Sequence, residues 1–271
     1  MMDKEKIKLM LRKYPKMFSR IIVSGIDIDK LMDKTALIVG AGGLGVLVSE
    51  MLARTGIGKI IIVDRDVVGE ENFNRLGFNR EDIGKPKAFA LKEKIERLRN
   101  SKNIPSDFHI KVEAYREDII AWPKLEELIK ESDIVFTCLD NKDARLEVNY
   151  FSMMYKKPLV DGATGISGLS GTIITVIPCK SPCYECHYGP DTSIKVDTIE
   201  RAGACDASLA NVMAIVASLQ VDQGIKILLN FGEVYDLLKI HLDKGVEITK
   251  LKGLKPRPDC MVHKEFCGAS K

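Results

Sequence analysis

A glycine-rich turn is the first stretch of this sequence whose residue types and spacing indicate chemistry. Gly40, Gly42 and Gly45 follow the apolar run 35–39 in the pattern G-x-G-x-x-G, and a helical pattern begins there. Glycines let backbone N–H groups approach a phosphate closely, and a helix start adds partial positive charge. Asp64 ends the next apolar run, where a carboxylate accepts hydrogen bonds from ribose hydroxyls. The pattern predicts a nucleotide site; a turn needed only for tight packing is the alternative.

Cations downstream of the turn decide between two classes of nucleotide. The fingerprint alone favours an NAD-dependent oxidoreductase. Arg75 and Lys87, however, stand in the next connection and at the following helix start. They suit the roughly four negative charges of ATP better than the roughly two of a dinucleotide pyrophosphate. Solvated surface cations are the alternative.

An acidic residue at a strand end indicates a metal beside the nucleotide. Asp140 follows the apolar run 133–139. A carboxylate at the carboxyl end of a parallel strand faces the ligand crevice, and the hard magnesium ion, Mg²⁺, prefers oxygen ligands. The sequence therefore predicts ATP bound with Mg²⁺.

Four of the seven cysteines form a candidate metal site. Cys183 and Cys186 have C-x-x-C spacing, which in a reducing compartment favours a metal over a disulfide framework. With Cys260 and Cys267 they would make a tetrahedral, structural Zn²⁺ site of four thiolates. Six residues separate the second pair, so three further residues stay open as substitutes: His187, His263 and Cys179.

A further cysteine is a candidate nucleophile. Cys205 stands just before the long apolar helix expected at residues 208–229. The positive end of a helix favours the thiolate form, which is the reactive one. A buried cysteine without chemistry is the alternative. Cys138, inside an expected core strand, is interpreted as packing.

Alternating strand and helix patterns must position these residues. Short apolar runs alternate with helical patterns from residue 34 to 178, which predicts an α/β fold with a doubly wound, mostly parallel, Rossmann-like sheet. The expected strands are residues 35–39, 59–64, 109–115, 133–139, 158–161 and 171–177, and the expected helices are 44–54, 86–99, 125–130 and 140–155.

The two ends of the chain complete the expected organisation. Residues 1–33 are predicted to form an N-terminal helical segment, and residues 34–178 the ATP-binding core. Residues 179–271 are predicted to form a zinc-binding knuckle and an antiparallel extension packed on the same core. Within this last segment we expect irregular structure at 179–189, then the long helix, and hairpin strands at 234–241 and 246–251.

Composition excludes several classes of function. The chain has 271 residues, 45% of them hydrophobic, 29% charged, and a net charge of +3. These values indicate a globular protein without a nucleic-acid-binding arm. The mixed-charge start precedes no long apolar run, so we expect no signal peptide, no membrane partner and a cytoplasmic location.

From Phe18 onward the sequence resembles the MoeB/ThiF/HesA family of ubiquitin-activating-like enzymes. Five motifs carry the resemblance, in the family's order: Gly40 to Gly45, Asp64 with Asp66, Asn72 with Arg75, Lys87, and Asp140-Asn141 with Arg145. The resemblance implies an adenylyltransferase that uses ATP to activate the C-terminal carboxylate of a ubiquitin-like or sulfur-carrier protein as an acyl-AMP.

The resemblance also implies a role for each residue in these motifs. Asp64 is implied to hold the ribose, and Arg75 and Lys87 to bind the phosphates. Asp140 is implied to coordinate Mg²⁺. The remaining residues implied to bind the nucleotide are Gly40, Gly42, Gly43, Gly45, Asp66, Asn72, Asn74 and Asn141.

Two features of the resemblance concern partners. Phe18-Ser19-Arg20 is similar to the family's Tyr-x-Arg-Gln segment, with Phe18 and Ile21 as departures. This implies that Arg20 reaches the ATP phosphates of a second subunit in a homodimer. The pattern from Cys205 and the widened spacing of the last two cysteines resemble the branch that activates the ubiquitin-fold modifier UFM. There Cys205 would accept the acyl group as a thioester.

Three other functions remain open on the sequence alone. The same site could adenylate a small-molecule carboxylic acid in cofactor biosynthesis. An NAD-dependent oxidoreductase is disfavoured by Arg75 and Lys87. A non-catalytic, zinc-stabilised scaffold would leave the phosphate-binding residues without a purpose.

Overall fold

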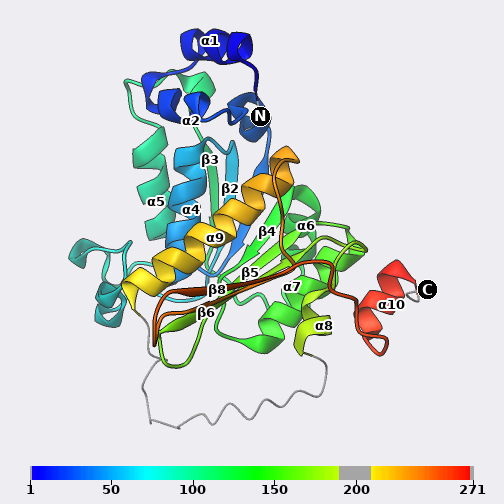
Figure 1. Ribbon diagram of the computed structural model, residues 1–271. Helices are drawn as coiled ribbons and strands as arrows, with labels where there is room; N and C mark the ends of the chain where they lie inside the picture. Colours follow the sequence, from blue (N-terminus) through cyan, green and yellow to red (C-terminus); the bar gives the residue numbers. More distant parts are fainter. Residues whose placement is uncertain (1, 189–208, 269–271) are drawn as a thin grey trace.

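In the part of the chain that the structure describes, eight strands form one sheet in the order β3-β2-β1-β4-β5-β6-β7-β8 (Figure 1). The computed structural model describes residues 2–188 and 209–268. The strands are β1 (Thr35–Val39), β2 (Lys59–Val63), β3 (Lys111–Tyr115), β4 (Ile134–Thr137), β5 (Leu159–Thr164), β6 (Ser170–Val176), β7 (Leu237–His241) and β8 (Glu247–Leu251). Strands β1 to β5 are parallel, whereas β6, β7 and β8 are antiparallel to their neighbours. The mostly parallel α/β sheet and its antiparallel extension are therefore confirmed.

The strand register places several carboxyl ends at one edge of the sheet. Val39 pairs with Val63 on one side and with Thr137 on the other. The chain order changes direction between β1 and β4, because β2 and β3 lie on one side of β1 and the later strands on the other. Ligands of doubly wound folds bind at such a switch point.

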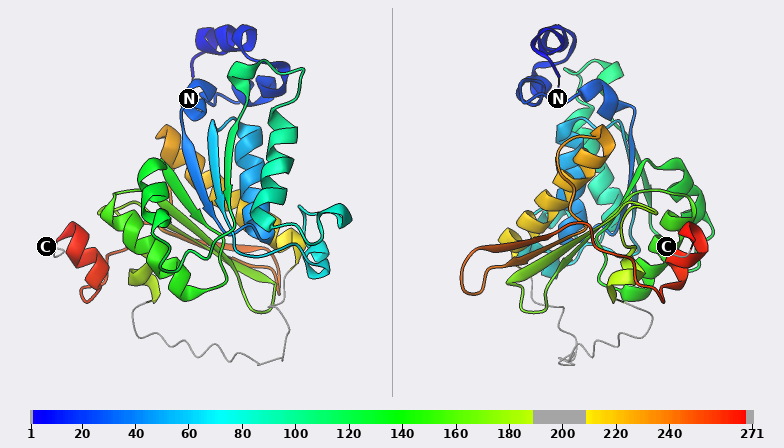
Figure 2. Two further views of the ribbon diagram at one scale, coloured as in Figure 1. Left: turned by 180° about the vertical axis from the view of Figure 1, so that it is seen from behind. Right: turned by 45° about the vertical axis from the view of Figure 1, so that its right-hand side comes forward.

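Helices cover both faces of this sheet, as Figures 1 and 2 show. One face carries α4 (Gly43–Thr55), α5 (Lys87–Arg99) and α9 (Ala210–Leu229), and the other α6 (Lys124–Glu131) and α7 (Lys142–Met154). In β1, Ala36 and Ile38 pack into the first layer, and Leu37 and Val39 into the second. Burial on both faces explains why the strands read as continuous apolar runs.

The N-terminal helices lie at the amino ends of the strands (Figure 2). They are α1 (Lys4–Lys13), α2 (Ser19–Val23) and α3 (Ile28–Met32), with the 3₁₀ turn η1 (Lys16–Phe18) between the first two. Arg99 of α5 anchors them, since its guanidinium stacks 4.8 Å from the Phe18 ring centre. The same buried group donates to Ala53 O at 2.6 Å and to Phe108 O at 2.7 Å. The helical lead-in expected at the N-terminus is thus packed on the core.

Helix α9 needs comment because, within the described residues, it is the one helix long and apolar enough to cross a membrane. Val216 and Ala217 are buried in the core beside the sheet. The side-chain amide of Gln220 donates to Thr137 O and to Val160 O, each at 3.2 Å. These contacts are those of a core helix, so its length and composition carry no membrane assignment.

Two short helices were not predicted. They are α8 (Tyr184–Tyr188), inside the segment expected to be irregular, and α10 (Met261–Cys267) in the tail. Both contact α7, on one face of the sheet. Helices of five and seven residues are too short to show a clear 3.6-residue periodicity. The other short elements are the 3₁₀ turns η2 (Glu70–Asn74), η3 (Arg80–Asp82) and η4 (Ser106–Phe108).

Candidate functional site

The carboxyl ends of β1, β2 and β4 open into a cleft of about 430 Å³. Parallel strands present their carboxyl ends at the same edge, which is why residues far apart in the sequence meet here. The cleft brings together most of the residues predicted to bind the nucleotide: Gly40, Gly42, Gly43, Asp64, Asp66, Asn72, Arg75, Lys87, Asp140 and Asn141.

Two glycines of the turn are required by the protein itself. Gly40 has φ +96°, and a Cβ there would lie 2.5 Å from Cys138 O. A Cβ on Gly45 would lie 1.8 Å from Gly40 O, so Gly45 supports the turn from behind and does not line the cleft. Both residues must be glycine for the chain to turn and pack.

Gly42 differs from these two because the protein does not require a glycine there. Its backbone is extended, with φ −77°, which any residue adopts. A Cβ on Gly42 would meet nothing within 4 Å, and Gly42 lines the cleft. The remaining physical reason for a glycine at position 42 is that it leaves room for a ligand to approach the backbone.

The start of α4 suits an anion. Its N-cap is Gly42, so the cap residue offers no side chain to the first turn. The backbone N–H groups at a helix start have no partner within the helix, and the helix dipole places partial positive charge there. Gly43 and Leu44 of this turn line the cleft. The arrangement is a phosphate-binding one.

Asp64 connects the glycine turn to β2. Its Oδ2 accepts from the Ala41 N–H at 2.6 Å, and its Oδ1 accepts from the Asp66 N–H at 2.8 Å. Burial raises the pKa of Asp64, although these N–H groups and Lys87 act against the rise. The carboxylate therefore fixes the turn, and its side chain lies in the cleft where a ribose is expected.

Two cations lie at the cleft beside the turn. The Lys87 side chain is 11% exposed, and its Nζ lies 3.1 Å from Asp66 Oδ2. Arg75 packs its Cδ against Gly43, and its Nε donates to Asn74 Oδ1 at 3.1 Å. Asn74 thus contacts Arg75 and does not itself line the cleft. Lys87 is largely buried beside the exposed Asp66 carboxylate and also acts on Asp64, and such a buried cation can bind further negative charge.

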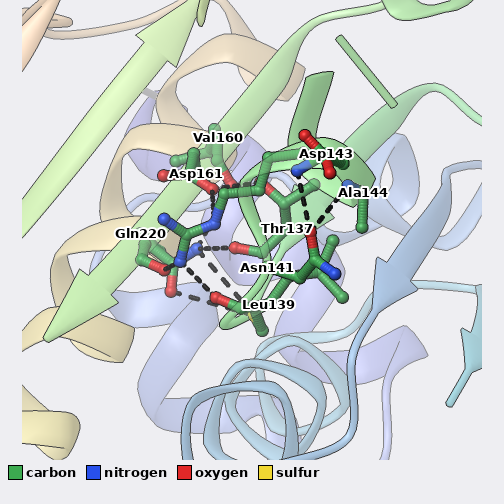
Figure 3. A network of polar contacts seen from close by, with 11 residues as sticks. Thr137, Leu139, Asn141, Asp143, Ala144, Val160, Asp161 and Gln220 are labelled. Carbon is green, nitrogen blue, oxygen red and sulfur yellow. Dashed lines mark hydrogen bonds and ion pairs between the residues drawn. The ribbon is translucent and has the colours of Figure 1, made fainter. Parts of the chain in front are cut away.

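A polar network that includes Thr137, Asn141 and Asp161 lies at the end of β4 (Figure 3). Asp140 is exposed at the cleft, three residues after Thr137, where β4 ends. Asn141 caps α7, since its Oδ1 accepts from the N–H groups of Asp143 at 2.8 Å and Ala144 at 3.3 Å. The helix start thereby holds this corner in place.

A buried ion pair forms the centre of that network. Arg145 Nε lies 3.3 Å from Asp161 Oδ1, and Thr137 donates to the same oxygen at 2.6 Å. Burial disfavours the charge on Arg145, but Asp161, Tyr184 and Tyr188 together more than offset this and raise the pKa of Arg145. The guanidinium also donates to Leu139 O. Arg145 therefore holds the peptide that leads into Asp140.

Several cleft residues were not predicted from the sequence. Arg65 lies 2.7 Å from Asp118 through Nη1 and Oδ2, and Ile119 and Ile120 follow in the loop after β3. Met213 reaches the cleft from α9. The topology could have predicted the loop after β3. Because β3 is parallel to β2, this loop must reach the edge of the sheet where the cleft lies.

Arg20 is a further predicted residue that does not line the cleft. Arg20 is exposed on α2, at the amino ends of the strands, opposite the cleft of its own chain. Cys205 lies outside the described residues.

The predicted four-cysteine set does not assemble. Cys183 Sγ lies 3.6 Å from Cys186 Sγ and 3.5 Å from Cys260 Sγ. Cys267 instead forms a disulfide with Cys179, so the expectation of metal binding over disulfides fails for this pair. The physical reason is α10: Cys267 lies seven residues beyond Cys260, and a rise of 1.5 Å per residue carries it roughly 10 Å along the helix.

The chain is similar to known proteins over most of its length. The family model described as the ThiF family matches residues 16–262. The chain is 31% identical over 251 residues to "Ubiquitin-like modifier-activating enzyme 5" of Dictyostelium discoideum, covering 88% of this chain and 63% of the relative. It is 32% identical over 246 residues to the protein of the same name from Gallus gallus, covering 86% and 60%. The chain thus spans about three fifths of these relatives.

Solved structures of similar fold include E. coli MccB. The structure of MccB with ATP has a TM-score of 0.74 at 23% identity, and the match covers 92% of this chain and 74% of MccB. The structure of MccB with AMPCPP and MccA has a TM-score of 0.76 at 23% identity, and the match covers 93% of this chain and 74% of MccB. At this identity the likeness shows a shared fold.

Proposed function

The chain belongs to the ThiF family, and from this premise we propose that it activates the C-terminal carboxylate of a ubiquitin-like or sulfur-carrier protein with ATP. The observation that carries the proposal is the cleft. One space joins an open glycine at a helix start, two cations and an exposed carboxylate after β4. The relatives named as ubiquitin-like modifier-activating enzymes support the choice of substrate.

The proposed reaction is a displacement at the α-phosphorus of ATP. A carboxylate oxygen of the substrate forms a bond to this phosphorus, the bond to the bridging oxygen breaks, and pyrophosphate leaves. Arg75 and Lys87 stabilise the negative charge of the phosphates, and Asp64 binds the ribose. The product is an acyl-adenylate.

A magnesium ion fits the donor chemistry of this cleft. Asp140 is exposed there, and carboxylate oxygens are the ligands that Mg²⁺ prefers. Asp140 would hold the ion, which when bound neutralises phosphate charge. The Arg145 contact to Leu139 O orients the peptide before Asp140.

Zinc fits the cysteine cluster. Tetrahedral coordination with Zn–S bonds of about 2.3 Å places sulfurs about 3.8 Å apart, close to the 3.5 and 3.6 Å between Cys183 and its two neighbours. Cys183, Cys186 and Cys260 are buried and would supply three ligands. A closed site of this kind is structural.

We further propose a homodimer in which Arg20 acts on the cleft of the second subunit. Its exposed position opposite its own cleft supports this arrangement. We also propose a step that follows adenylate formation. The Cys205 sulfur attacks the acyl carbon of the adenylate, forming a thioester and releasing AMP.

The test is ATP–pyrophosphate exchange with a panel of purified ubiquitin-like and sulfur-carrier proteins. We expect exchange that requires one carrier and is lost when its terminal glycine is deleted. Exchange with a small carboxylic acid and no carrier would favour the small-molecule alternative. A thermal shift with NAD and none with ATP would overturn the proposal in favour of an oxidoreductase, and the absence of exchange with every carrier would contradict it as well.

A further inference from the structure

We infer that the proposed zinc site is completed by His263 of α10 and that Cys267 takes no part in it. The inference rests on the zinc site proposed above and on no step of the adenylation reaction. It changes the ligand set from four thiolates to three thiolates and one imidazole.

The first observation is the position of His263. One ring nitrogen of His263 and the sulfurs of Cys183 and Cys186 all lie within 4.8 Å of one another. All three residues are buried, with His263 only 6% exposed. Imidazole nitrogen and thiolate sulfur together are the ligands that zinc prefers.

The second observation is an unsatisfied atom. Within the described residues, His263 Nδ1 is buried and has no hydrogen-bond partner. Buried polar atoms are nearly always paired, and an exception needs an explanation. A metal bound by the His263 ring at this cluster would provide one.

The spacing of the last two ligands supports the same set. Cys260 and His263 are three residues apart, and the Cys260 sulfur accepts from the His263 N–H at 3.4 Å. Residues three apart lie on the same face of a helix. The pair C-x-x-H at the start of α10 therefore matches the pair C-x-x-C at Cys183 and Cys186, each within one helical turn.

Cys267 is removed from the site by its covalent bond. Its sulfur is joined to Cys179, and it stands at the far end of α10 from Cys260. A sulfur in a disulfide has no thiolate to offer a metal. The two cysteines that the structure pairs are thus the two that the metal does not need.

His187 is the rival ligand and also the matched control. It follows Cys186 directly, and its Nε2 is likewise buried without a partner among the described residues. Its ring nitrogens, however, are not part of the cluster of ligand atoms that includes His263. Substitution of the two histidines separates their roles.

The experiment measures zinc content and the visible spectrum of the Co²⁺-substituted full chain. The variants are His263→Ala, His263→Cys, His187→Ala and Cys267→Ser. We expect one zinc per chain in the wild type, in His187→Ala and in Cys267→Ser. We expect at least a tenfold weaker zinc affinity in His263→Ala. His263→Cys should keep zinc and shift the Co²⁺ bands to longer wavelength, because a fourth thiolate replaces a nitrogen ligand.

A thiol reductant adds an independent arm. It reduces the Cys179–Cys267 bond to two thiols and is itself oxidised to a disulfide, and zinc content and the Co²⁺ spectrum should not change. The inference is overturned if Cys267→Ser loses the metal, or if His263→Cys has the wild-type spectrum. It is also overturned if His187→Ala alone loses zinc or if the wild type holds none. None of these outcomes bears on ATP–pyrophosphate exchange, which tests the proposed function separately.

Discussion

The nucleotide cleft and the cysteine cluster are built in different ways. In the cleft, the glycine turn, Asp64 and Asp140 follow the carboxyl ends of β1, β2 and β4, so the sheet sets their positions, and Lys87 joins them from the start of α5. In the cluster, Cys183 and Cys260 come from segments outside the sheet, held by two short helices and by bonds between side chains. A site at strand ends can be predicted from the strand pattern that precedes each residue. A site made of cysteines that are distant in the sequence depends on which of those cysteines come together in the fold.

The largest effect should come from the buried pair behind Asp140. Replacing Arg145 with Met leaves the Asp161 carboxylate buried without its partner, and breaking such a pair costs about 3–5 kcal/mol. Urea unfolding measures the loss. The control is Lys130→Met, which removes an exposed ion pair with Glu126 and should cost no more than about 1 kcal/mol. Equal costs for the two variants would show that the pair does not support the cleft.

A second effect should appear in catalysis without a comparable change in stability. Lys87→Ala removes the cation that we propose binds the phosphates, so the rate of ATP–pyrophosphate exchange should fall about 10²–10³-fold. Lys85→Ala, which removes a half-exposed lysine paired with Asp82, is the control and should retain nearly the wild-type rate. A fall of only a few-fold in Lys87→Ala would remove Lys87 from the phosphate site.

Removal of zinc tests whether the two regions are independent. A strong chelator should lower the Tm by roughly 4–8 °C, which corresponds to a loss of about 2 kcal/mol in a chain of this size. ATP affinity should change by less than about twofold, because distant sites act nearly additively. Calorimetry before and after chelation gives both values. Loss of ATP binding on chelation would show that the cluster supports the cleft.

The smallest effect should come from Gly42. Because a Cβ there meets no protein atom within 4 Å, Gly42→Ala should fold with unchanged stability. It should weaken ATP binding about tenfold, or about 1.4 kcal/mol, by occupying the ligand's space. Gly45→Ala is the contrasting variant, since its Cβ would lie 1.8 Å from Gly40 O, and it should be unstable. If ATP bound Gly42→Ala normally, the open side of Gly42 would not be the phosphate site.

The same difference explains what the sequence could predict. Strand runs such as residues 35–39 and the glycine turn carry their own local signals, so the sheet and the meeting of Asp64, Lys87 and Asp140 could be predicted. The Arg145–Asp161 pair could not, because no local pattern shows that a helix residue meets the next strand beneath the cleft.

The prediction of four cysteine ligands was wrong for a different physical reason. Spacing alone suggested that Cys267 belongs with Cys260, but the helix between them carries Cys267 away to Cys179. Because α10 has only seven residues, its periodicity was too weak to predict the helix and therefore the displacement. From the sequence, His263 could be predicted only as one of three alternative zinc ligands.

The Cys179–Cys267 disulfide has a topological consequence. The bond joins residues 88 positions apart, so the last third of the chain is a covalent ring that contains α9, β7 and β8. A single peptide bond cut by a protease within this ring would leave both fragments attached to each other. The fragments would separate on a gel only after reduction.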